Sequence, residues 1–316
     1  MSFLTVRNIS KKENGIDTVN DVSFLQESLQ NIAIAGETGS GKTTLVKMIG
    51  GLVQPDDGEI LFEGKRIKGP LEKLIPGHPG IIYLSQHFEL RNNYYVHEIL
   101  SYANQLTEQT AEKLFSICRI DHLLKRKTDQ LSGGEKQRIA LAKLLISSPK
   151  LLLLDEPFSN LDTIHKSIIK SVLKDVQEEF KVSSIMISHD IPDVLAWADS
   201  IIVMKDGKVL QKSVPREIYH RPVNEYCAAL FGEYNLVKMD NKNKRLFLRP
   251  EDIFITKNRD EAVFSALVKD VQFRGDSFFI EAVSEETLFK IRTVDETIQP
   301  GNFVYLSVNG NADWHL

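Results

Sequence analysis

Gly36-Glu37-Thr38-Gly39-Ser40-Gly41-Lys42-Thr43 is the stretch that decides the fold. It matches G-x-x-x-x-G-K-[ST], the phosphate-binding P-loop, in which glycines let backbone N–H groups close around phosphate oxygens. The apolar run Ile32–Ala35 before it predicts a buried strand, and Leu45–Ile49 after it predicts the beginning of a helix. Because a helix N-terminus adds a positive dipole, we expect this strand–loop–helix unit to bind a nucleotide phosphate.

Two side chains of the loop have specific expected roles. Lys42 should reach the β- and γ-phosphates, and the Thr43 hydroxyl should ligate Mg²⁺. A glycine-rich turn before a helix is the structural alternative, and the complete motif in its strand–helix context argues against it. The residues expected to contact the nucleotide are Gly36, Glu37, Thr38, Gly39, Ser40, Gly41, Lys42, Thr43 and Thr44.

Length and composition predict a globular protein with two domains. The chain has 316 residues, 42% of them hydrophobic and 26% charged, and its formal net charge of −4 gives no global basic field for nucleic acid. Cys118 and Cys227 lie far apart and predict reduced thiols rather than a zinc site. No apolar run approaches the roughly 18 residues of a membrane span, and the N-terminus lacks a signal-peptide pattern. We therefore expect a cytosolic protein unless a partner holds it at a membrane.

The order of predicted elements indicates the fold class. Strands alternate with helices through residue 205, which predicts an α/β fold with a doubly wound, mostly parallel sheet. Short strands with turns at Asn14-Gly15 and Asn20-Asp21 predict an antiparallel β-subdomain before the P-loop. Helical periodicity predicts an inserted helical subdomain over about residues 87–135. Leu151–Leu154 is fully apolar, as a central parallel strand should be.

The pattern changes after Tyr234. Residues 246–308 give short strands separated by turns such as Arg274-Gly275-Asp276 and Pro300-Gly301-Asn302, which is typical of a small all-β barrel or sandwich. A polar linker over residues 238–244 precedes them. We therefore expect one domain over residues 1–235 and a second over residues 236–316.

A second chemical motif follows the central strand. Asp155 at its carboxyl end can hold Mg²⁺, and Glu156 can orient and polarise an attacking water. Taken alone, an Asp-Glu pair after an apolar strand is better explained as a helix N-cap region. With a P-loop upstream, the pair favours nucleotide hydrolysis.

Four motifs together resemble the nucleotide-binding subunit of an ATP-binding cassette (ABC) transporter. They are Gly36–Thr43, Leu131–Glu135, Leu151–Glu156 and His189. The Leu131-Ser132-Gly133-Gly134-Glu135 signature is the most specific of them, since ordinary P-loop proteins lack it. The resemblance covers residues 1 to about 235. It implies a head-to-tail dimer with two ATP molecules, each lying between the P-loop of one chain and the signature of the other.

The resemblance also implies individual roles. Gln86 matches the Q-loop glutamine, which contacts Mg²⁺ and the water, and His189 matches the switch histidine, which supports Glu156. Asp162 belongs to the D-loop, which crosses the dimer seam. The implied catalytic residues are Glu156, His189, Lys42 and Gln86, and the implied Mg²⁺ ligands are Thr43, Gln86 and Asp155. The implied contacts to the second ATP are Ser132, Gly133, Gly134 and Asp162.

One position departs from the family pattern. The family usually places an aromatic residue upstream of the P-loop to stack on adenine, whereas this chain has Lys11-Lys12-Glu13-Asn14-Gly15. Stacking contributes roughly 1–3 kcal/mol by analogy with base–aromatic contacts. We therefore expect either a weak grip on adenine or an aliphatic contact from Ile16 or Val19.

The C-terminal part narrows the class. Arg249-Pro250-Glu251 resembles the entry to the regulatory β-domain (TOBE type) of bacterial importer ATPases, which serve sugars, polyamines, ferric iron, sulfate, molybdate and similar solutes. Arg216–Pro222 and Phe231–Asn235 resemble that group's connecting segment. A small β-barrel can also bind oligonucleotides, but no basic stripe with interleaved aromatics is present. We favour a structural or dimerising role for this domain over ligand sensing.

The resemblance implies the ATP-hydrolysing subunit of an ABC importer, peripheral at the cytoplasmic face of the inner membrane, with ATP and Mg²⁺ as cofactors. The implied partners are permease subunits, a second copy of the chain and an extracytoplasmic solute-binding protein, with no direct contact to nucleic acid. A groove near Gln86–Tyr95, including His87, Phe88 and Tyr94, should receive a permease helix. The alternatives are an exporter ATPase, a soluble ABC ATPase acting on nucleic acid or ribosomes, and a regulatory module with inactive chemistry.

Overall fold

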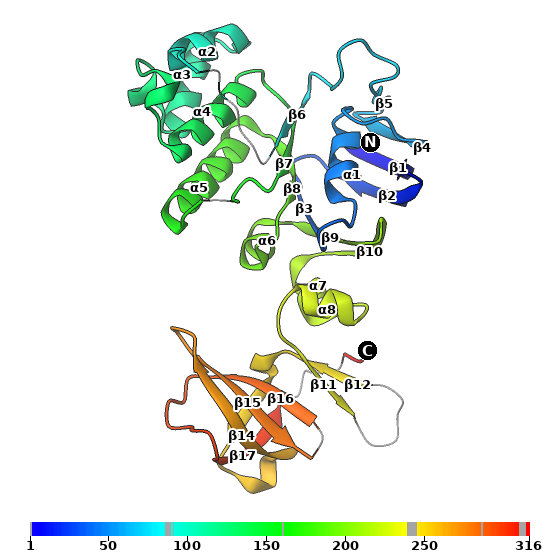
Figure 1. The fold of residues 1–316 in the computed structure, drawn as a ribbon, viewed down its shortest axis with the longest axis vertical. Coiled ribbons are helices and arrows are strands. Elements are labelled where there is room, and N and C mark those ends of the chain that lie inside the picture. The colour runs from blue at the N-terminus through cyan, green and yellow to red at the C-terminus, as the bar shows by residue number, and fades with distance from the viewer. Residues whose placement is uncertain are drawn as a thin grey trace. The chain divides into compact units, whose positions relative to one another are not determined.

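The computed structural model describes residues 2–85, 90, 92–159, 161–238, 245–285, 287–309 and 314–316. Gln86, His87 and Phe88, on which part of the predicted site depends, lie outside this range. The chain divides into two compact units, residues 1–215 and 216–316, which are coloured blue to green and yellow to red in Figure 1. The division falls before residue 235, so the segment 216–235 belongs to the second unit.

A six-stranded sheet with the order β10-β9-β3-β8-β7-β6 forms the centre of the first unit. All its neighbouring strands are parallel except the β9–β10 pair, which the Asp206-Gly207 turn joins as a hairpin. The strands are β3 (Asn31–Ala35), β6 (Ile81–Leu84), β7 (Leu151–Asp155), β8 (Ser183–Ile187), β9 (Ser200–Lys205) and β10 (Lys208–Ser213). The predicted doubly wound α/β sheet is therefore confirmed.

Strand β7 separates two hydrophobic cores. Leu151 and Leu153 belong to one core, together with α1 (Lys42–Ile49). Leu152 and Leu154 belong to the other core, together with α4 (Gly133–Leu145) and α5 (Thr163–Phe180). Figure 1 shows α1 and α5 on opposite sides of the central strands. This alternation follows from the two-residue period of a strand and fixes β7 in the middle of the unit.

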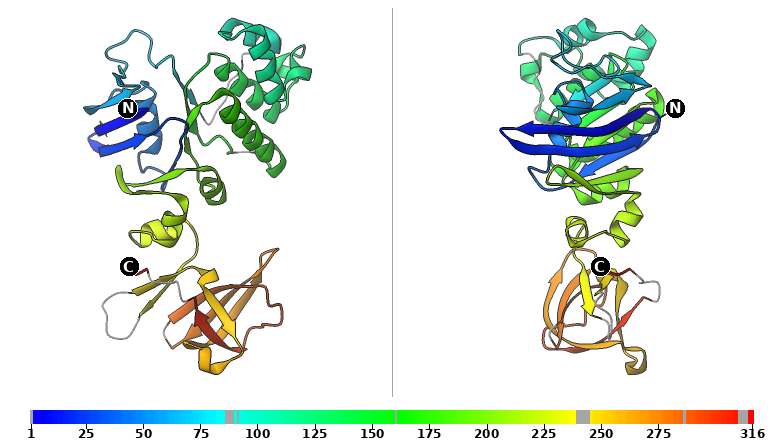
Figure 2. Two further views of the ribbon diagram at one scale, coloured as in Figure 1. Left: turned by 180° about the vertical axis from the view of Figure 1, so that it is seen from behind. Right: turned by 90° about the vertical axis from the view of Figure 1, so that its right-hand side faces the viewer.

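The N-terminal β-subdomain is built on one long hairpin. β1 (Leu4–Glu13) and β2 (Ile16–Gln26) pair antiparallel, and β4 (Asp57–Phe62) and β5 (Lys65–Arg66) complete the sheet in the order β2-β1-β4-β5. Figure 2 (right) shows the hairpin as a long dark-blue ribbon.

The predicted turn at Asn20-Asp21 is wrong, because both residues lie inside β2. Asp21 has φ of 52°, and the register with β1 shifts between Ile9↔Val22 and Lys11↔Val19. The segment is thus a β-bulge, which uses the same left-handed backbone conformation that Asp tolerates in turns.

The inserted helical subdomain contains α2 (Val96–Ala103) and α3 (Glu108–Ile117), followed by short 3₁₀ turns at Asp121–Leu123 and Thr128–Gln130. Val96 and Leu100 of α2 and Leu114 of α3 are buried in the core shared with α4 and α5, and Ala103 and Ile117 are partly buried against it. After β7 and α5, a short helix, α6 (Ile191–Trp197), follows β8.

The second unit combines two short helices, α7 (Pro215–His220) and α8 (Glu225–Leu230), with β-structure. Strands β11 (Asn235–Lys238) and β12 (Arg245–Leu248) form a two-stranded sheet. A five-stranded antiparallel sheet has the order β13-β17-β14-β15-β16. Its edge strands, β13 and β16, contact each other, so the sheet curls into a half-barrel with its own hydrophobic core. Its strands are β13 (Ile253–Thr256), β14 (Phe264–Phe273), β15 (Phe278–Ser284), β16 (Thr287–Thr293) and β17 (Phe303–Val308).

Arg249 explains why residues 216–235 belong with this β-structure. Its side chain is fully buried, and burial lowers the pKa of its guanidinium. Nε donates to the carbonyl oxygen of Tyr219 at 2.9 Å, and one terminal nitrogen donates to the carbonyl oxygens of Ala228, Gly232 and Glu233, each at 3.1 Å. One arginine thus satisfies backbone groups throughout the connecting segment and ties it to the end of β12.

Candidate active site

The P-loop wraps around the ammonium group of Lys42, the first residue of α1. Lys42 Nζ donates to the carbonyl oxygens of Gly36 at 2.8 Å and Glu37 at 2.6 Å, and it lies 3.2 Å from Ser40 Oγ. Burial lowers the pKa of Lys42, while the carboxylates of Glu156, Asp155 and Glu37 act in the opposite direction. The predicted loop therefore holds one cation at the N-terminus of a helix, as binding of a polyphosphate requires.

Gly41 shows why this loop needs glycine. Its φ is 93°, and a Cβ at this position would lie 2.1 Å from the carbonyl oxygen of Thr18 on β2. An L-residue would meet both a strained backbone and a direct collision. The β-subdomain thus closes directly against the P-loop.

Asp155, at the carboxyl end of β7, joins the P-loop to the neighbouring strand. Its Oδ1 accepts from Thr43 Oγ1 at 3.3 Å, and its Oδ2 accepts from the Tyr83 hydroxyl at 2.7 Å. Burial, with this hydrogen bond, raises the pKa of Tyr83. Thr43 and Asp155, the two predicted Mg²⁺ ligands within the described residues, thus lie together and carry oxygens of the kind that Mg²⁺ prefers. Tyr83 was not among the predicted site residues, because it lies in an otherwise apolar strand whose sequence indicates only a buried core. It stands opposite Leu153 in the pairing of β6 with β7.

Glu156 and His189 meet where two adjacent strands end. Glu156 follows β7, His189 follows β8, and His189 Nε2 lies 2.9 Å from Glu156 Oε1. Glu156 has φ of 51°, and its backbone is held by a bond from its N–H to Ile187 O and one from Ser159 Oγ to its own carbonyl. Both side chains border a cavity of about 310 Å³. The cavity is lined by Glu156, Phe158, Ser159, Lys166, Ser188, His189 and Asp190.

The signature residues form the N-terminus of α4. Ser132 caps the helix: its Oγ accepts from the Glu135 N–H at 3.3 Å, and Glu135 Oε2 accepts from the Ser132 N–H at 2.8 Å. This backbone hydrogen bond is the main reason that the pKa of Glu135 lies below its usual range. The reciprocal capping leaves the positive end of α4 well ordered.

The D-loop residue Asp162 caps α5. Its Oδ1 accepts from the His165 N–H at 2.9 Å, and its Oδ2 lies 2.7 Å from His165 Nδ1. The backbone N–H of His165 is the main reason that the pKa of Asp162 lies below its usual range. The structure thus brings Lys42, Thr43 and Asp155 together, and it pairs Glu156 with His189. The signature residue Gly134 instead lies against α5 of the same chain. Gln86 lies outside the described residues.

The two aliphatic candidates for the adenine contact differ sharply in exposure. Val19 is fully buried in the core, whereas Ile16 is 71% exposed. Ile16 begins β2 and stands two residues from Thr18, whose carbonyl abuts Gly41. Of the two, Ile16 is the side chain with free surface.

Comparison with known proteins identifies the family. A family model described as ABC transporter matches residues 19–159. The sulfate/thiosulfate import ATP-binding protein CysA of Mesostigma viride is 31% identical, with 87% of this chain and 85% of that protein covered. The CysA of Pseudomonas syringae pv. tomato is 32% identical, with 86% and 85% covered. Both alignments cover more of the chain than residues 1–215 contain, so the similarity extends into the second unit.

Solved structures agree with this assignment. The cbiO1 protein of Clostridium perfringens, described as part of the ABC transporter complex cbiONQ, has a TM-score of 0.59 at 27% identity, with 69% of this chain and 90% of that chain covered. MJ1267, an ATP-binding cassette of an ABC transporter in its ADP conformation, shares the fold with a TM-score of 0.59 at 24% identity, with 69% and 94% covered. Within the described part of the chain, no helix has both the length and the apolar character needed to cross a membrane. The chain belongs to the ABC transporter family, as an ATPase subunit of the importer type.

Proposed function

We propose that this chain binds Mg²⁺–ATP at the interface of two copies and hydrolyses it through Glu156 to drive import of a solute through a membrane permease. The observation that carries the proposal is the contact of 2.9 Å between His189 Nε2 and Glu156 Oε1, next to the Asp155–Thr43 pair. A carboxylate oriented by an imidazole and adjacent to an Mg²⁺-type oxygen site is the arrangement that phosphoryl transfer to water requires.

Three residues of one chain would handle the phosphates. Thr43 and Asp155 would hold Mg²⁺, which neutralises charge on the β- and γ-phosphates. Lys42 would exchange its bonds to the P-loop carbonyls for phosphate oxygens. Gln86 would be a further Mg²⁺ ligand, by resemblance to the family.

Glu156 and His189 would act on the attacking water. Glu156 would align the water in line with the γ-phosphate and accept its proton. His189 would keep the carboxylate in place and donate a hydrogen bond to a γ-phosphate oxygen. The unusual backbone conformation of Glu156 supports this role, since strained residues cluster at reacting centres.

A second copy would complete each site. The capped N-terminus of α4, with Ser132, Gly133 and Gly134, would supply backbone N–H groups and dipole to the ATP held by the other copy. Since a single chain carries all the motifs, the proposed assembly is a homodimer. Asp162, which caps the neighbouring helix α5, would line the same seam.

The chemistry is tested by Glu156→Gln, which keeps the shape of the side chain and removes its basicity. ATP binding should persist, turnover should fall by at least about a hundredfold, and Mg²⁺–ATP should trap a dimer. ATPase rates and size-exclusion chromatography give these readouts. The matched control is Glu112→Gln, an exposed residue of α3. Equal turnover in Glu156→Gln and the control would remove Glu156 from catalysis.

The proposed partners are permease subunits and a solute-binding protein, at the cytoplasmic face of the inner membrane. Tyr94 and Tyr95, each 40% exposed, would lie beside the permease groove. The names of the relatives favour import over the exporter and non-transport alternatives, and they make sulfate and thiosulfate the first solutes to test.

Purification of the chain from solubilised native membranes tests these partners. A polytopic membrane protein should copurify, and a solute-binding protein should be found with it by mass spectrometry. Replacement of Tyr94 by Asp should weaken this association without lowering the ATPase activity of the isolated chain. Recovery in the soluble fraction with ribosomes or nucleic acid would contradict the proposed transport function.

A further inference from the structure

The first turn of α5 lies directly against the signature segment. A Cβ placed on Gly134 would lie 2.4 Å from His165 Cδ2, so the imidazole ring covers this glycine at van der Waals distance. The ring is oriented from its other side, because His165 Nδ1 lies 2.7 Å from Asp162 Oδ2. His165 therefore connects the D-loop cap of α5 to the N-terminus of α4.

The next residue, Lys166, faces the segment that follows the switch histidine, His189. Its Nζ forms an ion pair with Asp190, the residue after His189, and lies 2.7 Å from Asp193 Oδ2. Asp190 caps α6, so the lysine holds the segment that carries the switch histidine. Lys166 also lines the 310 Å³ cavity that Glu156 and His189 border. Its side chain is only 19% exposed, so this contact differs from an ordinary surface ion pair.

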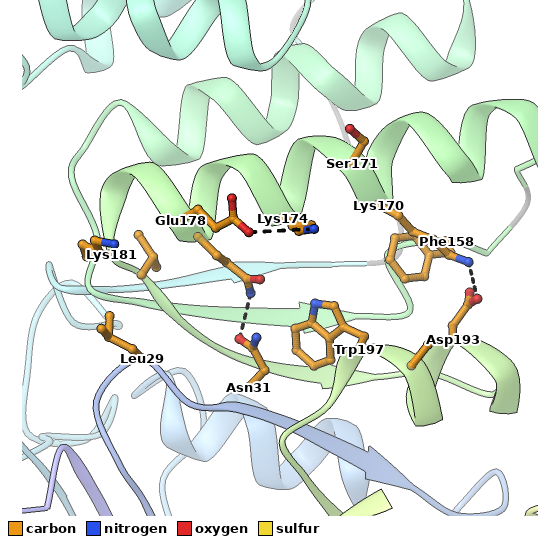
Figure 3. Close-up of a pocket in the computed structure, with 13 residues that line it drawn as sticks. Leu29, Asn31, Phe158, Lys170, Ser171, Lys174, Glu178, Lys181, Asp193 and Trp197 are labelled. Atoms are coloured by element: carbon orange, nitrogen blue, oxygen red, sulfur yellow. Dashed lines mark hydrogen bonds and ion pairs between the residues drawn. The ribbon is translucent and has the colours of Figure 1, made fainter.

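A second lysine strengthens the same junction one turn later. Lys170 forms an ion pair with Asp193, which is 7% exposed, and its ammonium lies 5.8 Å from the centre of the Phe158 ring. Figure 3 shows Lys170 of α5 and Asp193 of α6 pointing toward each other beside Phe158. Partial burial is the largest influence on Asp190 and opposes its ionisation. The hydrogen bonds from Lys166 and from the Asp193 N–H, with the charges of the two lysines, together outweigh it, so the pKa of Asp190 lies below its usual range.

The helix itself is suited to transmit displacement. It is 18 residues long, and consecutive residues point about 100° apart around its axis. His165 and Lys166 can therefore reach different neighbours from one turn. Because a helix turn is rigid, a shift of α4 against His165 changes the position of Lys166 relative to Asp190.

We propose that His165 and Lys166 are positioning residues through which α5 couples the signature segment to the Glu156–His189 pair. The inference rests on the proposed function, in which the signature acts on the ATP held by the other copy while His189 acts on the ATP of its own chain. α5 then links the two hydrolysis sites of the dimer, so that closure at one ATP sets the carboxylate and imidazole at the other.

Steady-state kinetics test the role of the lysine. Lys166→Met should lower kcat about tenfold and change the KM for ATP by less than about twofold, since it touches no nucleotide. Lys166→Arg should restore kcat to within about threefold of the wild type, because a guanidinium can pair with the same carboxylates. The control is Lys174→Met, a residue 73% exposed on the same helix whose ion pair with Glu178 is 3.9 Å long.

Amide hydrogen exchange tests the coupling without reference to activity. Lys166→Met should raise exchange in residues 188–190 and also in residues 132–138, which the lysine does not contact. His165→Ala should raise exchange in the same two segments. Asp190→Asn removes the charge and keeps a helix cap, so it repeats the test should Lys166→Met not fold.

The outcomes separate the two proposals. Exchange that rises only next to each substituted residue would overturn the coupling, and so would an equal loss of kcat in Lys174→Met. If the wild-type chain hydrolyses no ATP while exchange still rises in both segments, the proposed function fails and the coupling stands. The coupling also predicts that His165→Ala and Lys166→Met together cost less than the sum of their separate effects on kcat.

Discussion

Single residues decide how the phosphate chemistry is held. Asp155 divides its oxygens between the Thr43 and Tyr83 hydroxyls, so one lies toward the P-loop and the other is fixed by a neighbouring strand. The motif around Asp155 could be predicted because it is local in sequence. Tyr83 could not, because a phenol in an apolar strand shows its function only through the register with β7.

Ile16 is the residue for a test of nucleotide affinity. Ile16→Tyr should lower the dissociation constant for ATP about tenfold, since base–aromatic stacking contributes roughly 1–3 kcal/mol where the isoleucine can offer only an aliphatic contact. The dissociation constant for inorganic triphosphate, which has no adenine to stack, should change less, because the P-loop is the same in both proteins. Fluorescent-nucleotide titration of the wild type and the variant measures the difference.

Leu25→Tyr provides the matched control for this change. Leu25 lies on the same strand, is 50% exposed, and stands near the opposite end of β2 from the P-loop side. It should leave the dissociation constant for ATP unchanged. Equal affinity in the two tyrosine variants would mean that Ile16 does not face the adenine.

At the scale of the element, prediction worked where the period of the pattern was clear. The apolar runs Ile32–Ala35 and Leu151–Leu154 lie in parallel strands, and the helices α2 and α3 lie within the segment where helical spacing predicted helices. The prediction of a turn at Asn20-Asp21 was wrong because the same dipeptide suits both a turn and a β-bulge. Which of the two forms depends on pairing with β1, a contact that no local window contains.

At the N-termini of α4 and α5, too, some features could be predicted from the sequence and others could not. Sequence motifs marked Ser132 and Asp162 as expected site residues, and the structure shows in addition that each of them caps a helix. The contact of His165 with Gly134 could not be predicted, since it joins residues of two different helices. Functional coupling between elements is therefore the part of the site that sequence patterns reveal least.

At the scale of the whole molecule, the two units have separate cores. The residues of the half-barrel core all come from the second unit, and Arg249 supplies hydrogen bonds within that unit alone. In the sequence, the pattern changes from alternating strands and helices to short strands near Tyr234, which predicted the domain boundary there. The compact division lies earlier because Arg249 binds backbone groups of residues 219–233, a tertiary effect without a sequence signal.

Arg249→Met should destabilise the second unit selectively. The change leaves four carbonyl groups without their donor, one of them buried and three partly buried, which should cost about 3 kcal/mol in the free energy of unfolding. The ATPase rate of the isolated chain should stay within about twofold, because no site residue is touched.

The two tryptophans allow this to be measured unit by unit. Trp197 lies in the first unit and Trp314 in the second, where its indole N–H donates to Pro222 O at 2.8 Å. Urea unfolding followed in Trp197→Phe and Trp314→Phe backgrounds reports each unit separately. Arg259→Met, at an exposed arginine of the second unit, is the control. Equal shifts of both midpoints in Arg249→Met would contradict separate stability.

The burial of β7 on both faces also bears on how this protein can change over generations. Every residue of the strand is buried, so none of its positions tolerates substitution as freely as an exposed surface position does. A replacement of any of its four leucines disturbs one of the two cores that the strand separates, and so lowers stability before any new chemistry can arise. Innovation is confined to the few residues beyond its carboxyl end, where Glu156 and its neighbours can vary on a support that stays constant.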